Sequence, residues 1–280
     1  MNINFAINQG SKILKNKLIP NSLLDSEILM AKTLNKDRKF ILLNSSCFIE
    51  KNNLNKFYKL IKLRSLGNPI AHLTKKKFFW NSEFFVTNDA LIPRPDTELA
   101  VEIILSLTKF KNKIRLLDIG IGSGCILLSI LKERPNFYGV GIDISNKSIK
   151  VSKYNAKMLQ LKNKVKFYHS DVDNFKIGKY DLIVSNPPYI NFPVLKYLDK
   201  DVVNFEPKIA LDGGFDGISK IRKVINRAAV LIKKNGKLVL EIGFNQKNRV
   251  LSILKNEGFY TNKIVKDYGK KDRCVISTKI

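Results

Sequence analysis

The 280-residue sequence predicts an α/β protein with a doubly wound, mostly parallel sheet that carries an antiparallel hairpin at one edge. Apolar, strand-like runs alternate with amphipathic runs from about residue 96 onward, which is typical of a parallel sheet with helices on both faces. A glycine-rich turn follows the first of these strands, as in α/β folds that bind nucleotides. Only a short polar turn separates the last two strand-like runs, which indicates the edge hairpin.

Residues 1–74 have the pattern of a small helical domain. Apolar side chains recur at spacings of three and four, for example at Leu24 and Ile28 and again at Phe57 and Leu60, as expected for helices with one apolar face. Two roles are open for this domain. It is a docking surface for a protein substrate, or a cap that only stabilises the rest of the chain.

Residues 75–95 are predicted to form a β-hairpin linker. Aromatic residues stand on both sides of Asn81-Ser82, and Pro93-Arg94-Pro95 ends the pattern. Asp96 or Thr97 is placed to cap the helix that follows.

Residues 96–280 make up the third predicted domain, which contains the sheet. Five parallel strands are expected near residues 114–119, 138–143, 164–169, 180–185 and 236–242, with helices between them. The edge pair is expected near residues 260–265 and 273–278.

The glycine-rich turn is Asp118-Ile119-Gly120-Ile121-Gly122-Ser123-Gly124. Its G-x-G-x-G spacing lacks the third glycine of the dinucleotide fingerprint, and no Gly-Lys-Ser/Thr follows to cradle a triphosphate. The loop therefore predicts a nucleotide-like ligand that is neither a dinucleotide nor ATP.

Acidic residues end the next two strands. Asp143 lies about 20 residues beyond the loop, where α/β nucleotide folds place a carboxylate on ribose hydroxyls, and Asp171 can accept from an adenine amine. The alternative for each acid is a helix cap or a surface charge. An adenosine site without a phosphate cradle fits S-adenosylmethionine.

Asn186-Pro187-Pro188-Tyr189 follows the strand near residues 180–185. Two prolines remove two backbone donors, so the carbonyls of Asn186 and Pro187 stay free to accept. An Asn side-chain carbonyl beside a free main-chain carbonyl accepts both hydrogens of a planar NH2 group, and Tyr189 offers a ring face to that plane. The alternative interpretation is a proline-rich turn after a buried strand.

These motifs together resemble the release factor glutamine methyltransferase family (PrmC/HemK), and the resemblance covers nearly the whole chain. It is strengthened by the segments Gly67-Asn68-Pro69, Leu91-Ile92-Pro93-Arg94-Pro95-Asp96-Thr97-Glu98, Phe205-Glu206-Pro207 and Ala210-Leu211-Asp212-Gly213-Gly214. It implies a Rossmann-like methyltransferase fold and an enzyme that methylates the side-chain amide nitrogen (N5) of the glutamine in the Gly-Gly-Gln motif of class I peptide chain release factors. The cofactor would be S-adenosyl-L-methionine.

The resemblance and the motifs assign the site residues as follows. The cofactor-binding residues are Gly120, Ile121, Gly122, Ser123, Gly124, Asp143, Asp171, Val172 and Asn186. The catalytic residues are Asn186, Pro187 and Tyr189, and the substrate-binding residues are these three with Pro188. Val172 stands where family members often carry an aromatic residue beside the adenine. An amino-group methyltransferase that acts on adenine or guanine in RNA or DNA remains the alternative.

Composition bears on whether the protein binds nucleic acid or a metal ion. Lys and Arg number 50 against 24 acidic residues, a net charge of +26, which raises nucleic-acid binding as a possibility. The lysines are spread along the chain and accompany many Asn and Ile residues, so codon composition explains the excess, and no dedicated nucleic-acid site is expected. Two histidines and three cysteines without metal-ligand spacing predict no metal site. We expect a cytoplasmic monomer that does not contact membranes.

Overall fold

The structure is a computed structural model that describes residues 1–280, apart from the side chain of Lys200, and it divides into two compact units. The first unit consists of Met1–Lys76 and Asp199–Phe205. The second consists of Lys77–Leu198 and Glu206–Ile280. The domain boundaries 1–74, 75–95 and 96–280 stay predictions.

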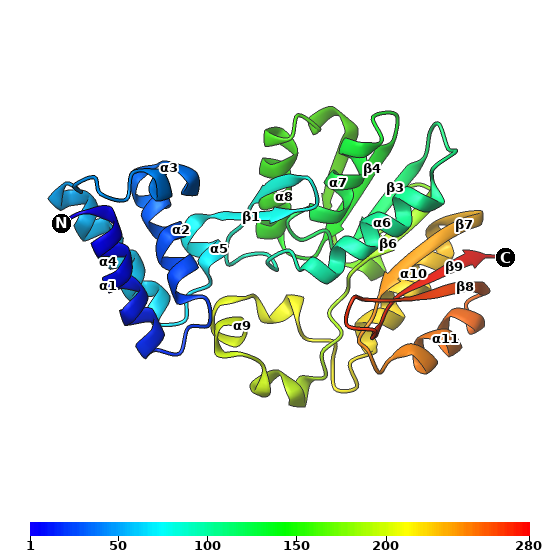
Figure 1. Ribbon diagram of the computed structural model, residues 1–280. Helices are drawn as coiled ribbons and strands as arrows, with labels where there is room; N and C mark the ends of the chain where they lie inside the picture. The colour runs from blue at the N-terminus through cyan, green and yellow to red at the C-terminus, as the bar shows by residue number, and fades with distance from the viewer. The chain divides into compact units, whose positions relative to one another are not determined.

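The first unit is helical, as the apolar spacing predicts (Figure 1). Its helices are α1 (Ile3–Asn16), α2 (Ser22–Leu34), α3 (Arg38–Leu43), α4 (Lys51–Ser65), α5 (Ile70–Thr74) and α9 (Lys200–Phe205). Buried side chains of α1, α2 and α4 form its core. Gly10 permits close packing, because a Cβ there would lie 2.6 Å from Ser26 Oγ. Arg64 pairs with Asp25 at 2.7 Å inside this unit, where both side chains are buried.

The hairpin predicted near Asn81-Ser82 is present. Strands β1 (Lys76–Phe79) and β2 (Ser82–Phe85) form a two-stranded sheet. The side chain of Asn155 anchors β2 through two hydrogen bonds to the backbone of Phe85. It accepts from Phe85 N at 2.8 Å and donates to Phe85 O at 3.0 Å.

The second unit is organised around a seven-stranded sheet with the order β5-β4-β3-β6-β7-β9-β8. Its strands are β3 (Arg115–Ile119), β4 (Tyr138–Asp143), β5 (Val165–His169), β6 (Tyr180–Ser185), β7 (Ile232–Glu241), β8 (Phe259–Lys266) and β9 (Asp272–Lys279). The pairs β7–β9 and β8–β9 are antiparallel and the others are parallel. The predicted sheet with its edge hairpin is therefore confirmed.

Strand β7 differs from the prediction in where it begins. It starts at Ile232 rather than near residue 236, because Ile232 pairs with Tyr180 before a register shift toward Leu182. The chain passes through Asn235, which has φ 63°, within this irregular stretch. Asn tolerates that left-handed conformation. The local Lys-Lys-Asn-Gly sequence is typical of a turn and not of a strand.

Helices cover both faces of the sheet (Figure 1). One face packs against α6 (Glu98–Leu107), α7 (Cys125–Glu133) and α8 (Asn146–Met158), and the other against α10 (Ser219–Leu231) and α11 (Lys247–Asn256). Leu116 belongs to the first apolar cluster and Leu117 to the second, as expected when successive strand residues point to opposite faces. Short 3-10 helices lie in the connections: η1 (Pro95–Thr97), η2 (Lys162–Lys164), η3 (Val172–Asn174), η4 (Phe192–Tyr197) and η5 (Lys208–Ala210).

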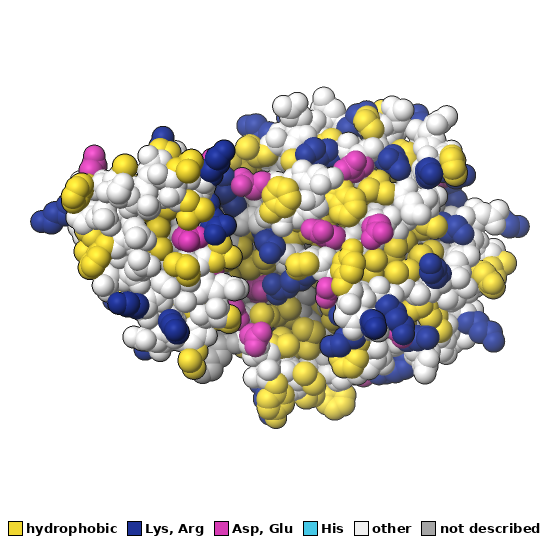
Figure 2. Space-filling view, viewed as in Figure 1, with side chains coloured by type: hydrophobic (Ala, Val, Ile, Leu, Met, Phe, Trp, Pro, Cys, Tyr) yellow, Lys and Arg dark blue, Asp and Glu magenta, His cyan; other side chains and the backbone are white. Residues whose placement is uncertain are grey.

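Basic side chains are scattered over the visible face of the molecule and do not form a single stripe (Figure 2). Within the described residues, none of the helices combines the length and hydrophobicity needed to span a bilayer. The same residues contain no cluster of His, Cys, Asp and Glu suited to a metal ion.

Candidate active site

The candidate site is a cavity of about 190 Å³ at the carboxyl ends of β3, β4, β5 and β6. Strand β3 lies between β4 and β6, so the chain winds away from it in both directions. This is the topological switch point, where open α/β sheets bind their ligands. Ten of the predicted site residues line the cavity, and they come from the ends of four strands: Gly120, Ile121, Gly122, Ser123, Asp143, Asp171, Val172, Asn186, Pro187 and Pro188.

The glycine loop after β3 presents bare backbone to this cavity. Gly120 and Gly122 have φ values of +75° and +57°, and a Cβ on either would meet nothing within 4 Å. Gly124 has a different role, because a Cβ there would lie 2.8 Å from Leu128 Cδ1. Its φ of +84° and its place at the start of α7 show that it allows the helix to pack closely. Gly124 does not line the cavity.

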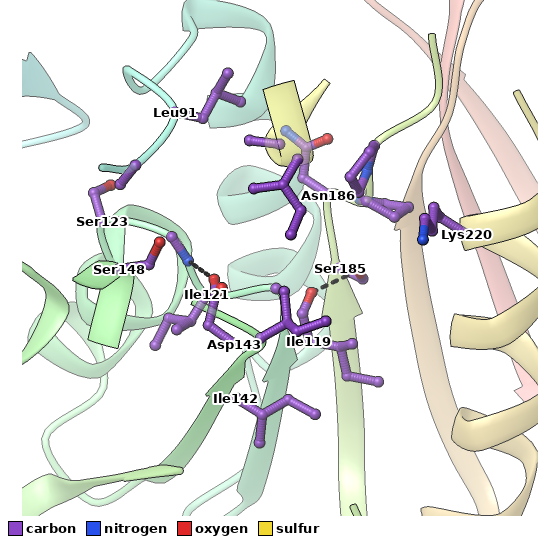
Figure 3. A pocket seen from close by; sticks show the side chains of 18 of the residues that line it. Leu91, Ile119, Ile121, Ser123, Ile142, Asp143, Ser148, Ser185, Asn186 and Lys220 are labelled. Carbon is purple, nitrogen blue, oxygen red and sulfur yellow. Dashed lines mark hydrogen bonds between the residues drawn. The ribbon is translucent and has the colours of Figure 1, made fainter. Parts of the chain in front are cut away.

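Asp143 ends β4 and holds the glycine loop (Figure 3). Its Oδ2 accepts from Gly122 N at 2.9 Å, and its Oδ1 accepts from Ser145 N at 2.8 Å. Burial raises the pKa of Asp143. Each carboxylate oxygen keeps a further lone pair for a ligand, so the local role leaves room for the predicted contact with ribose.

Asp171 and Val172 form the wall beyond β5. Asp171 Oδ1 accepts from Asp173 N at 2.9 Å and thereby caps η3. Val172 packs against the second apolar cluster of the sheet and also lines the cavity. Asp171 therefore acts as a helix cap, and its place in the cavity wall is also compatible with the predicted role beside adenine.

A buried acid lies beneath the glycine loop. Neither carboxylate oxygen of Asp118 has a hydrogen-bond partner among the described residues. Burial, with a smaller contribution from the charge of Asp143, raises the pKa of Asp118 to about 7. Two carboxyl groups so close to the loop favour a cationic ligand and disfavour a phosphate.

Asn186 reaches the same cavity from the end of β6 (Figure 3). Its Nδ2 donates to Thr97 Oγ1 at 3.1 Å. Its Oδ1 has no hydrogen bond among the described residues and remains available in the cavity. Pro187 and Pro188 line the cavity next to it. The prediction that Asp96 or Thr97 caps α6 is wrong for Thr97, which makes no capping bond.

Tyr189 is predicted as a ring face for the substrate, and it does not line the cavity. Its hydroxyl donates to Glu241 Oε1 and accepts from Arg273, both at 3.3 Å. Gln246 Nε2 donates to the main-chain carbonyl of Tyr189 at 2.8 Å. Burial raises the pKa of the Tyr189 hydroxyl, and the charge of Glu241 adds to this. The structure therefore fixes Tyr189 from both its hydroxyl and its backbone.

An ion pair that the sequence does not predict closes the wall of the cavity. Arg94 Nη2 donates to Glu206 Oε1 at 2.5 Å, and Ile92 N donates to Glu206 Oε2 at 3.2 Å. The Glu206 side chain is 1% exposed, and Arg94 lines the cavity. The segments that contain these residues stand out in the sequence, but their pairing depends on the fold.

Cys125 also lines the cavity, at the start of α7. Burial raises the pKa of its thiol to about 12. The thiol is therefore protonated at neutral pH and does not act as a nucleophile.

The residues of this cavity fit S-adenosylmethionine. Backbone without side chains is open at Gly120 and Gly122, carboxylates lie at the ends of two successive strands, and the buried carboxyl group of Asp118 lies beneath the loop. The fold and the site together define a class I methyltransferase that uses S-adenosyl-L-methionine.

Comparisons with known proteins agree with this class. Residues 94–197 match the family described as Methyltransferase small domain, and residues 6–74 match the PrmC N-terminal domain. A solved methyltransferase from Pyrococcus furiosus has the same fold, with a TM-score of 0.54 and 17% identity, over 78% of this chain and 97% of that one.

Two relatives are similar over nearly their full length, and both are named release factor glutamine methyltransferase. The protein of Clostridium acetobutylicum is 36% identical over 100% of this chain and 99% of its own. The protein of Buchnera aphidicola subsp. Baizongia pistaciae is 38% identical over 96% and 95%. The chain belongs to the release factor glutamine methyltransferase family.

Proposed function

We propose that this protein methylates the side-chain amide nitrogen (N5) of the glutamine in the Gly-Gly-Gln motif of class I peptide chain release factors. The names of the relatives support this substrate over an adenine or guanine amine in RNA or DNA. The observation that carries the proposal is the position of Asn186: its free Oδ1 opens into the same cavity as Gly120 and Gly122.

The substrate is held by acceptors. A glutamine side chain presents two N–H donors in one plane, and Asn186 Oδ1 with the Pro187 carbonyl accepts them. Because both N–H bonds are held, the nitrogen lone pair, which is otherwise delocalised into the amide, points out of that plane. The neighbouring prolines donate no backbone N–H of their own and cannot compete for these acceptors.

The cofactor, when bound, would supply an electrophilic methyl group. The bond from this methyl group to sulfur would break as its bond to the amide nitrogen forms, and one of the two N–H protons of the amide would then leave to solvent. The open backbone of Gly120 and Gly122 and the carboxylates of Asp143 and Asp171 would hold it. Catalysis by this chain is then mainly alignment, which supplies several kcal/mol when the reacting atoms lie ~3 Å apart. Apolar walls, including Ile119, Ile121 and Ile142, keep water away from the reacting nitrogen (Figure 3).

The helical unit gives the enzyme a second contact with a protein substrate. Leu18, Leu43 and Phe48 are 89%, 75% and 85% exposed on it, and such side chains are available to a partner. We infer that a release factor places its Gly-Gly-Gln loop in the cavity and another surface on residues 1–74. The enzyme acts as a monomer in the cytoplasm and needs no nucleic-acid site.

The test is a methyl-transfer assay on an intact release factor with wild type and Asn186→Ala. Removal of one positioned polar group is expected to lower turnover by ~10²-fold or more, with a much smaller effect on the cofactor dissociation constant. Wild-type turnover by Asn186→Ala would refute the role of the clamp. Absence of methyl transfer by wild type would refute the function.

A further inference from the structure

A second cavity, of about 540 Å³, lies at the amino ends of the parallel strands β3, β4, β5, β6 and β7. The candidate active site is at the opposite ends of these strands. The volume of the second cavity is in the range of pockets that hold small ligands, about 300–1,000 Å³. Five separate segments of the chain meet in it, and the proposed methyl transfer uses none of them.

The second cavity is strongly basic. Its charged lining consists of five cationic side chains and one carboxylate: Lys113, Arg115, Lys164, Lys166, Lys233 and Asp181. The twelve lining residues therefore carry a net charge of +4, whereas the 280 residues of the whole chain carry +26. Per residue, the charge of the cavity is more than three times the average over the chain. Positive charge is thus concentrated here.

The carboxylate of this cavity is already satisfied by the protein. Asp181 accepts from Lys233 Nζ at 2.7 Å and from the backbone N of Arg115 at 2.8 Å. The other four cationic side chains form no ion pair with a carboxylate within the described residues. Their charges are available to a ligand.

Aromatic rings hold three of these four cations. Lys113 Nζ and Lys164 Nζ lie 5.7 and 4.8 Å from the centroid of the Tyr138 ring. Arg115 Cζ lies 5.0 Å from the centroid of the Tyr180 ring. A ring face attracts a cation without neutralising it, so it offsets part of the repulsion between neighbouring positive charges. The cavity therefore presents its cations before a ligand arrives.

This arrangement suits a compact ligand with several negative charges. Buried apolar residues, Ile114, Val140 and Val165, form part of the lining, and walls of low dielectric strengthen the field of the cations. Phosphate oxygens accept from ammonium groups, and the planar guanidinium of Arg115 can donate two parallel hydrogen bonds to one phosphate. A chain of phosphate groups offers this chemistry at several neighbouring points.

We propose that the second cavity binds a small ligand that carries a chain of phosphate groups. Inorganic polyphosphate and a nucleoside triphosphate share this chemistry. The inference goes beyond the proposed function and does not depend on it, because the two cavities lie at opposite ends of the strands. S-adenosylmethionine has no phosphate group, so the ligand differs from the cofactor.

The experiment is a calorimetric titration of the full-length protein with inorganic triphosphate, with the cofactor site saturated by S-adenosylhomocysteine. The variant Lys113→Gln/Lys164→Gln removes two positive charges from the cavity. We expect it to raise the dissociation constant of triphosphate by ~10-fold or more, the scale of one lost hydrogen bond to a charged group. ATP, titrated in the same way, distinguishes the two sources. A lower dissociation constant for ATP than for triphosphate assigns a nucleotide, and equal constants assign the phosphate chain alone.

The matched control is Lys59→Gln/Lys62→Gln, which removes the same charge from exposed positions of α4 in the helical unit. It should bind triphosphate as wild type does. Both double variants should keep the wild-type affinity for S-adenosylhomocysteine, which shows that they are folded.

Three results would overturn the inference: no binding of triphosphate at millimolar concentration, equal losses of affinity in the two double variants, or displacement of S-adenosylhomocysteine by triphosphate. The last result would place the phosphate chain in the cofactor cavity. Tighter binding of a short RNA oligonucleotide than of triphosphate would also overturn it, because the cavity would then be part of an extended nucleic-acid surface.

Discussion

Gly213 lies against the main chain of Tyr189 so closely that a Cβ on it would come within 2.8 Å of Tyr189 Cα. Gly213 N also donates to Ile190 O at 2.9 Å. The Ala210-Leu211-Asp212-Gly213-Gly214 segment therefore supports the backbone of the Asn186-Pro187-Pro188-Tyr189 turn. Glycine is required at position 213 because the two backbone segments touch there.

Gly213→Ala should displace Tyr189 and its neighbours and lower kcat by ~10²-fold, the cost of a misplacement of about 1 Å. Gly269→Ala is the control, since the nearest atom to a Cβ there is Asp267 Oδ1 at 3.2 Å on the surface turn before β9. Steady-state kinetics with the release factor measure both. Unchanged kcat in Gly213→Ala would show that this contact can relax.

Asp143→Ala should weaken cofactor binding. The substitution removes the acceptor of Gly122 N and, by our proposal, of the ribose hydroxyls, so we expect a loss of roughly 1.5–3 kcal/mol, or ~10- to 150-fold in the dissociation constant. Asp181→Ala is the control, because Asp181 pairs with Lys233 at the opposite end of the strands. Calorimetry that finds equal affinity in both variants would reduce Asp143 to a structural role.

Asp118, the buried acid under the glycine loop, should make the stability of the protein depend on pH. The pKa of Asp118 is about 7 in the folded protein and close to 4 in the unfolded chain. The folded state therefore binds the proton more tightly, and its contribution is complete below pH ~4 and is lost as the pH rises through ~7. The slope from this group is at most about 1.4 kcal/mol per pH unit.

Urea unfolding at pH 5 and pH 7.5 tests whether Asp118 makes the protein less stable as the pH rises. Asp118→Asn should lose less stability than wild type between these two pH values, because an uncharged amide replaces the carboxyl group. Equal losses in the two proteins would contradict the raised pKa of Asp118.

The sequence predicted the sheet and the loops of the site because each depends on local signals. Strand-length apolar runs, a glycine loop and an Asn-Pro-Pro-Tyr turn are all readable within a dozen residues. The hydrogen bonds of Asn186 with Thr97 and of Tyr189 with Glu241 were not predictable, since Thr97 lies in η1 and Glu241 ends β7, both distant in sequence from the loop after β6. The cap predicted at Asp96 or Thr97 is absent at Thr97 for the same reason: the position before α6 is a local signal, and the hydrogen-bond partner of Thr97, Asn186, is distant in sequence.

Docking by the helical unit predicts a difference between large and small substrates. Phe48→Ala should raise KM for the intact release factor by ~5-fold or more, the scale of one interface side chain worth about 1 kcal/mol. It should not change methylation of a short Gly-Gly-Gln peptide. Phe110→Ala is the matched control, since Phe110 is 88% exposed on the second unit. An equal KM for the intact factor in wild type and Phe48→Ala would remove Phe48 from the docking surface.

Methylation of the release factor is tested most directly by incubating the enzyme with isotopically labelled S-adenosylmethionine, an intact class I release factor and total RNA, and locating the label by mass spectrometry. We expect one methyl group on N5 of the Gly-Gly-Gln glutamine, and loss of that label with Asn186→Ala. Label found only in nucleic acid, or on another residue of the factor, would contradict it.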